Sequence, residues 1–143
     1  MEAIFSTAYE CETAFYAAFN ACDYRQMMKV WSSEAAVLCV HPGGSLLQGR
    51  EAVLSSWQQI LSAANPLQIS VSEHHIIEHG DLAVRVVHEN IHHGPELRDL
   101  SVVLATNVFA RESAGWKLFS HHASSAPPRL SAPHPRRPRG TMH

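Results

Sequence analysis

The amino-acid sequence predicts an α+β fold in which three amino-terminal helices pack on a strongly curved, mostly antiparallel sheet. A change of pattern along the chain carries this prediction. Before residue 64 most apolar residues recur every three or four positions, as on one face of a helix, whereas after Pro66 they alternate with polar residues, as in a strand. Helices followed by strands are typical of α+β proteins, and a sheet curved around helices leaves an internal pocket.

The first two helices are expected over residues 3–21 and 24–32. In both segments the spacing of apolar residues is that of one buried helix face. Asp23 is a candidate N-cap for the second helix, because Gln26 follows three residues later, as in a capping box. The connection between the two helices is therefore expected to be tight.

The third helix is expected to begin at Arg50, after Gly49, and to end before Asn65 and Pro66, because the residue before a proline disfavours helical geometry. Its apolar stripe is the clearest helical signal in the chain. The stripe consists of Val53, Leu54, Trp57, Ile60, Leu61 and Ala64.

The strands are expected in two groups. A short strand at 36–41 and a partner near 45–48 surround Pro42-Gly43-Gly44 and form a small hairpin before the third helix. Four longer strands follow Pro66, separated by glycine-containing turns as in an antiparallel meander. Their expected ranges are 67–72, 82–93, 100–110 and 116–124.

The last 19 residues differ from the rest in composition. They contain five of the eight prolines, four arginines and no acidic residue, and such a segment buries too little apolar surface to offset its ordering entropy. We therefore expect one domain over residues 1–124 and a disordered Pro/Arg-rich tail over 125–143. Without the tail, seven basic residues face 13 acidic ones, a net charge near −6. A net-acidic domain argues against nucleic acid as a partner.

Cysteine usage and hydropathy predict the compartment. The three cysteines form no close-spaced pair, and each falls at an apolar position of an expected helix or strand, as is typical of a reducing environment. The first residues lack the basic and apolar regions of a signal peptide, and no apolar run approaches the roughly 20 residues that span a bilayer. The expectation is a cytoplasmic protein with no membrane partner.

A histidine at the end of the first strand is the candidate catalytic residue. His41 shares a strand face with Val37 and Cys39, and Pro42 then turns the chain away. If that face lines the pocket, desolvation lowers the pKa of the imidazole below about 6.5, so the ring is a neutral base at pH 7. The alternative is a structural histidine that bonds a neighbouring carbonyl.

Four segments carry a resemblance to a known superfamily. They are similar to the helix junctions and the last strand of nuclear transport factor 2-like proteins, and they span residues 14–23, 31–37, 49–53 and 115–124. This superfamily includes SnoaL-like cyclases and ketosteroid isomerases. The resemblance covers about residues 5–124. It implies a cystatin-like cone with an internal pocket, and a SnoaL-like domain that acts on or binds a small molecule.

The ketosteroid isomerases resemble this chain closely enough for single positions to be matched. Their catalytic phenol falls on Phe15, and Tyr16 beside it is expected to point elsewhere. Their carboxylate base falls near His41, and their protonated carboxylic acid falls near Thr106. Because the two groups that stabilise the oxyanion are missing, steroid isomerisation by that mechanism is not expected.

The other histidines allow further readings. His121 and His122 are neighbours on one strand, so at most one reaches the pocket, and the resemblance favours His122. A metal site would need His41 with His88, His122 or Glu89 from separate strands; no spacing supports it, so neither a metal nor another cofactor is expected. Arg85 and Glu89 share a strand face, as a buried pair or as part of an exposed surface.

The sequence thus supports two functions. The first is proton transfer on a small apolar carbonyl compound, as in isomerisation, cyclisation or hydration, with His41 as the catalytic residue. The second is a noncatalytic ligand-binding or dimerisation module, with two copies packed through the outer face of the sheet. The residues expected to contact the ligand are Phe15, Trp31, Trp57, Thr106 and His122.

Overall fold

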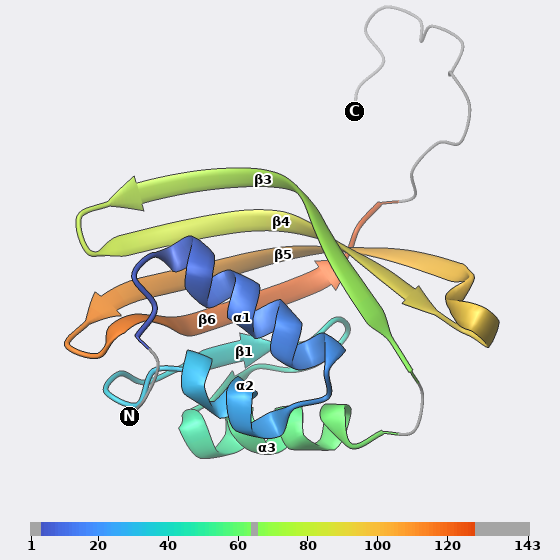
Figure 1. Ribbon diagram of the computed structural model, residues 1–143, viewed down its shortest axis with the longest axis horizontal. Coiled ribbons are helices and arrows are strands. Elements are labelled where there is room, and N and C mark those ends of the chain that lie inside the picture. The colour runs from blue at the N-terminus through green and yellow to red at the C-terminus, as the bar shows by residue number, and fades with distance from the viewer. Residues whose placement is uncertain (1–3, 64–65, 128–143) are drawn as a thin grey trace, which may run out of the picture.

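A computed structural model describes residues 4–63 and 66–127 of the chain. Three helices cover the concave side of one curved, six-stranded sheet (Figure 1), which confirms the predicted α+β fold. The elements in chain order are α1 (Ala8–Asn20), α2 (Tyr24–Val30), β1 (Leu38–Val40), β2 (Leu47–Gln48), α3 (Arg50–Leu61), β3 (Gln68–His79), β4 (Leu82–His93), a 3-10 turn (Pro95–Leu97), β5 (Asp99–Glu112) and β6 (Gly115–Ser125).

Side-chain caps set where the first two helices begin. α1 starts at Ala8, five residues later than expected, because the side chain of Thr7 accepts a hydrogen bond from the Glu10 amide. α2 begins where the sequence predicted, since the Asp23 carboxylate accepts from the Gln26 amide. Between them Cys22 adopts a φ of 53° and is exposed, unlike the buried position expected for it.

The strands lie in the order β2-β1-β6-β5-β4-β3. All neighbours are antiparallel except β1 and β6, which run parallel. Side chains of β4 alternate between the concave face, where Arg85 and Glu89 are buried, and the convex face, where Val84 and Val86 are half-exposed. Two charged residues therefore lie on the inner face of the sheet, against the helices.

A bulge in β6 changes which residues face inward. Leu118 pairs with Phe109 and Ser120 pairs with Val108, so Phe119 is an extra residue without an opposite partner. If side chains alternated strictly along β6, every even-numbered residue would lie on the same face as Leu118, which is buried. Beyond the bulge, however, His121 is buried and its neighbour His122 is exposed.

The ends of the chain and its cysteines complete the description. β6 continues to Ser125, the first residue of the expected tail, and residues 128–143 lie outside the described residues. Cys11 and Cys39 are buried free thiols. Within the described ranges, none of the helices has the length and apolar character needed to cross a bilayer.

Candidate functional site

An apolar cavity of about 170 Å³ lies between the helices and the concave face of the sheet. Aromatic and aliphatic side chains make most of its wall, and four side chains able to exchange or donate a proton interrupt that wall. The apolar residues are Phe15, Phe19, Pro42, Trp57, Ile60, Leu67, Ile69 and Ile91, and the four polar ones are Tyr16, His41, Glu89 and His121.

The Glu89 carboxyl is the central polar group of the cavity. Its pKa is raised to about 7: burial is the largest cause, a hydrogen bond from Tyr16 opposes the rise, and the nearby charge of Glu12 adds to it. The Tyr16 hydroxyl donates to Glu89 Oε2 across 2.6 Å, and burial keeps the pKa of that hydroxyl above its usual value. Tyr16 is thus a fixed donor, and Glu89 exchanges its proton near neutral pH.

His121 lies beside Glu89 as a neutral base. Burial lowers its pKa to about 3, with further contributions from His41 and His122. Its Nδ1 contacts Asn107 Oδ1, which is the oxygen because Asn107 Nδ2 donates to Glu12 and to Tyr16. Nδ1 therefore carries the hydrogen, and Nε2 keeps a lone pair.

Nε2 of His121 lies 3.9 Å from Glu89 Oε2, yet the two groups do not form an ion pair. An ion pair and a neutral pair hold the same single proton, and in an apolar cavity the neutral arrangement avoids the desolvation of two charges. Burial is the largest cause both of the lowered pKa of His121 and of the raised pKa of Glu89. Below about pH 7 the proton is mostly on the carboxyl, and the imidazole is neutral with a lone pair on Nε2.

A buried ion pair supports these groups from behind. Arg85 Nε donates to Glu12 Oε1 at 2.8 Å, with both side chains 4% exposed. The second oxygen of Glu12 accepts from Asn107 at 3.0 Å. Asn107 is fully buried and also bonds Tyr16 at 3.1 Å, so one amide orients both His121 and Tyr16. The chain of hydrogen bonds connects α1 with β4, β5 and β6.

His41 reaches the cavity from the opposite side. Its ring packs edge-on against Trp57, with ring centres 4.8 Å apart, and burial lowers the pKa of the imidazole. Nε2 lies 2.9 Å from the Ser56 hydroxyl, which itself donates to the Val53 carbonyl at 2.7 Å. The hydroxyl proton is therefore committed, so Nε2–H donates to Ser56 and Nδ1 keeps the lone pair.

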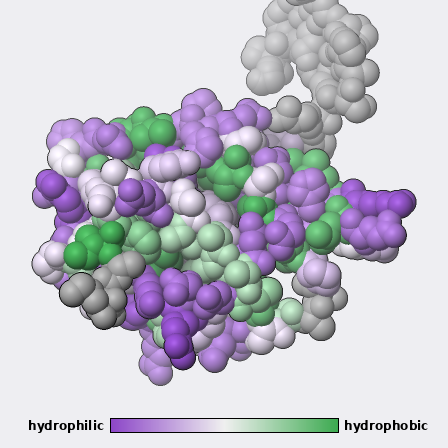
Figure 2. Space-filling model, in the orientation of Figure 1, coloured by the Kyte–Doolittle hydropathy of each residue, from purple (hydrophilic) through white to green (hydrophobic). Residues whose placement is uncertain are grey.

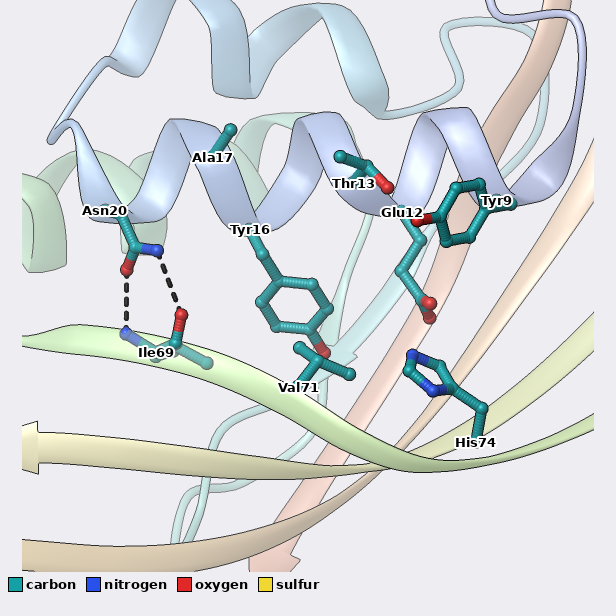
Figure 3. A pocket seen from close by; sticks show the side chains of 9 residues that line it. All are labelled: Tyr9, Glu12, Thr13, Tyr16, Ala17, Asn20, Ile69, Val71 and His74. Atoms are coloured by element: carbon teal, nitrogen blue, oxygen red, sulfur yellow. Dashed lines mark hydrogen bonds between the residues drawn. The ribbon is translucent and has the colours of Figure 1, made fainter.

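A second, more open hollow of about 350 Å³ lies between α1 and β3 (Figure 3). Glu12 and Tyr16 point from α1 toward the sheet there, and His74 points back from β3. The Asn20 amide bonds the backbone of Ile69 in both directions, at 2.9 and 2.8 Å, and fixes α1 to β3. Tyr16 and Ile69 line both hollows, so they separate this groove from the cavity.

Three of the residues predicted for the site line the cavity: Phe15, Trp57 and His41. Trp31 does not line it; its indole is buried behind Phe15, with ring centres 6.3 Å apart.

Thr106 and His122 lie elsewhere. They are paired on neighbouring strands and share the convex face, because the inward positions are those of Asn107 and His121. Of the two inward residues, His121 lines the cavity, and Asn107 lies behind it and bonds it.

Tyr16, Glu89 and His121 line the cavity but were not among the catalytic or ligand-contacting residues predicted from the sequence. The expectation that Tyr16 points away from the pocket is wrong, since its hydroxyl reaches Glu89. The first alternative for Arg85 and Glu89 is half correct: both are buried, but Arg85 pairs with Glu12. A buried strand face that carries two charges was the available signal, because such charges need partners.

The polar residues of the cavity do not form a metal site. Among residues 4–63 and 66–127, no three histidine, cysteine or acidic side chains converge as ligands would. The groups that do converge are a carboxyl, a phenol and two imidazoles in an apolar wall. This arrangement is suited to moving protons on a small molecule.

Comparison with known proteins agrees with this fold. The SnoaL-like domain family matches residues 9–128. A candidate association domain of calcium/calmodulin-dependent protein kinase type II from Thiobacillus denitrificans is 37% identical; the match covers 88% of this chain and 100% of that one, with a TM-score of 0.77. A candidate dehydratase of the nuclear transport factor 2-like family from Streptomyces avermitilis is 36% identical, over 82% and 92% of the two chains, with a TM-score of 0.74.

More distant structures share the fold alone. A nuclear transport factor 2-like protein of unknown function from Pseudomonas putida is 16% identical, covers 86% of each chain and has a TM-score of 0.70. A search of curated proteins returned no match. The family match spans most of the chain, and the two structures above one-third identity agree with it. This chain belongs to the SnoaL-like domain family of the nuclear transport factor 2-like superfamily.

Proposed function

We propose that the cavity binds a small, mostly apolar carbonyl compound and that its polar residues transfer protons on that compound. The observation that carries the proposal is Glu89, a carboxyl with a pKa of about 7, held 3.9 Å from the neutral imidazole of His121. Paired acid and base groups with separated pKa values are typical of proton-transfer sites. Isomerisation, cyclisation, hydration and dehydration all belong to this reaction class.

The residues take distinct roles. Nε2 of His121 removes a proton from carbon next to the carbonyl, and protonated Glu89 donates to the oxygen that gains negative charge or leaves as water. Because the two atoms are near neighbours, removal and donation occur on one face of the substrate. Tyr16 holds Glu89 in place, and His41 is a second base on the Trp57 side of the cavity.

Size and lining restrict the substrate. A cavity of about 170 Å³ admits a compound of roughly one ring or a short branched chain. Among the described residues, the wall has aromatic side chains from α1 and α3 and no arginine or lysine, which favours an uncharged molecule over a carboxylate or phosphate. The similar candidate dehydratase supports this class, since dehydration pairs removal of a proton with protonation of a leaving hydroxyl.

The experiment needs no knowledge of the natural substrate. Cyclohexanone in D₂O exchanges its α-hydrogens slowly, and NMR follows the loss of their signal. Wild-type protein should accelerate the exchange, and Glu89→Gln and His121→Ala should remove the acceleration, whereas Glu51→Gln, at an exposed carboxyl on α3, should leave it unchanged. Equal rates with wild type, Glu89→Gln and buffer would reject the proposal.

We further propose that two copies pack through the convex face of the sheet. One row of paired residues crosses that face and is mostly apolar: Ile77, Val84, Val108, Ser120 and Leu38. Ile77 is 69% exposed and Leu38 is 40% exposed. Such a contiguous apolar surface is typical of a contact between subunits. The similarity to a candidate association domain supports this interpretation.

Sedimentation equilibrium tests the dimer. Wild-type protein should sediment as a dimer at micromolar concentration, and Leu104→Glu, on the convex face, should sediment as a monomer. Leu46→Glu adds the same charge at an exposed residue outside the strands and should remain dimeric. A wild-type monomer would reject the proposal.

The thiols support the cytoplasmic location expected from the sequence. Burial raises the pKa of both Cys11 and Cys39 to about 12, so these thiols stay protonated and unreactive. Cys22 is exposed and unpaired. An exposed free thiol is compatible with a reducing compartment, and localisation of a fluorescently tagged chain in its source cells tests this.

A further inference from the structure

The basic residues of the described chain fall into two groups. Seven lysine and arginine side chains lie in residues 4–63 and 66–127, and three of them, Arg85, Arg98 and Arg111, are each paired with a carboxylate. The other four form no ion pair with any described residue. All four line one pocket of about 260 Å³ at the end of α2, namely Arg25, Lys29, Arg50 and Lys117.

Of the residues that the structure describes, no carboxylate lines that pocket. Its remaining lining residues are Met28, Trp31 and Ser33. Glu112 accepts a hydrogen bond from the Ser32 hydroxyl at 2.6 Å and forms no ion pair with the four cations. Hydrophilic side chains gather over α2 in Figure 2, in a domain whose net charge is otherwise negative. The positive charge is therefore local, and no carboxylate of residues 4–63 or 66–127 forms an ion pair with it.

Two of the four cations are held in place by hydrogen bonds to backbone carbonyls and have further N–H groups available. Arg50 donates to the carbonyls of Trp31, Ser32 and Met28 at 2.8 to 3.0 Å, which uses three of its five N–H groups. Lys117 donates one hydrogen to the Lys29 carbonyl at 2.7 Å and has two more. These bonds satisfy the carboxyl end of α2, but they neutralise neither charge.

Lys117 and Trp31 are both buried here. Lys117 is 6% exposed, and its ammonium lies 5.6 Å from the centre of the Phe5 ring. Trp31 is 1% exposed, and its indole N–H has no hydrogen-bond partner among the described residues. A buried cation without a counter-charge and a buried donor without an acceptor both cost free energy that a bound anion would offset.

We propose that this pocket is an anion site that binds a phosphoryl group, either as free phosphate or as the phosphate of a small monoester. A compact dianion with several acceptor oxygens suits four cations and their unused donors, and Arg and Lys are the usual partners of phosphate. The site is separate from the apolar cavity, so it does not depend on the proton-transfer chemistry.

Titration with inorganic phosphate tests the site through Trp31. The indole N–H signal of Trp31, assigned with Trp31→Phe, should shift and saturate with phosphate and should not shift with sodium chloride at equal ionic strength. Phenyl phosphate in a parallel titration distinguishes the two sources: tighter binding than phosphate indicates a monoester, and weaker or absent binding indicates the free ion.

Two double variants distinguish a specific phosphate site from a general effect of positive charge on the protein. Arg25→Ala with Lys29→Ala removes the two outer cations of the pocket, and half-saturation by phosphate should need about tenfold more ligand. Arg98→Ala with Arg111→Ala removes the same charge from two exposed ion pairs and should leave the titration unchanged. No saturable shift in wild type, or equal weakening in both double variants, would overturn the proposal.

Discussion

The hydroxyl of Tyr16 on α1 donates to Glu89 Oε2 on β4 across 2.6 Å, inside an apolar cavity. This bond joins residues 73 positions apart in the sequence. It holds the carboxyl in position, and it opposes the effect of burial on the pKa of Glu89. The properties of the site therefore depend on a contact between helix and sheet.

Replacing Tyr16 by Phe should change the pH dependence of the site. Without the hydroxyl the pKa of Glu89 should rise above about 7, since the bond lowers it. The alkaline limit of proton exchange on cyclohexanone should move to higher pH, and unfolding free energy should fall by about 1–3 kcal/mol. Tyr9→Phe, at an exposed tyrosine on the same helix, is the control, and an unmoved alkaline limit would contradict the assigned role.

Glu89→Gln should stabilise the protein at alkaline pH. Folding raises the pKa of Glu89 from 4.5 to about 7, so the folded chain holds more protons in that window and its stability falls as pH rises through it. The full loss of unfolding free energy caused by Glu89, on the order of 3 kcal/mol, is reached above pH 7. Glutamine still accepts from Tyr16 but carries no charge.

Chemical denaturation at several pH values measures this effect. The difference in unfolding free energy between Glu89→Gln and wild type should grow in favour of the variant from about pH 4.5 to about pH 7. His121 has the opposite slope, because its pKa falls to about 3 on folding, but it is present in both chains and cancels in the difference. A difference that does not vary with pH would show that Glu89 titrates normally.

Arg85→Ala should be strongly destabilising. It leaves the carboxylate of Glu12 buried without its counter-charge, which costs about 3–5 kcal/mol. Arg98→Ala breaks an exposed pair with Glu96 and should cost less than about 1 kcal/mol. Thermal or urea unfolding compares the two, and equal small losses would mean that the network behind the cavity is not a rigid support.

His41→Ala should distinguish the contributions of His41 and His121 to proton transfer. If His41 takes part in proton transfer, the exchange rate should fall by about 100-fold or more. Ser56→Ala removes only the acceptor of Nε2–H and should have a smaller effect, because the lone pair on Nδ1 remains. Exchange that survives in His41→Ala but not in His121→Ala would assign the base to His121 alone.

The fold could be predicted from periodicity because the spacing of apolar residues within each helix or strand shows which of its faces is buried. The stripe around Trp57 specified α3, and the spacing of Asp23 and Gln26 specified the start of α2. His41 and its position in the cavity followed from one short strand and the turn after it. Such signals lie within a few residues of each other in the sequence.

The rest of the site could not be predicted, because it depends on strand register and long-range contacts. The extra residue at Phe119 brings His121 inward in place of His122, and a shift of one position exchanges Thr106 for Asn107. No local sequence pattern indicates that Tyr16 bonds Glu89. Only the presence of charged residues on a buried strand face indicated that partners were needed.

The protonation of Glu89 tests the account most directly. Carboxyl ¹³C chemical shifts of glutamate-labelled protein, assigned with Glu89→Gln, follow this group across the pH range. The titration midpoint of Glu89 is expected near pH 7, with His121 neutral throughout that transition. A midpoint near the ordinary value of 4.5, or a charged His121 at neutral pH, would show that the cavity holds an ion pair or solvent and would contradict the proposed chemistry.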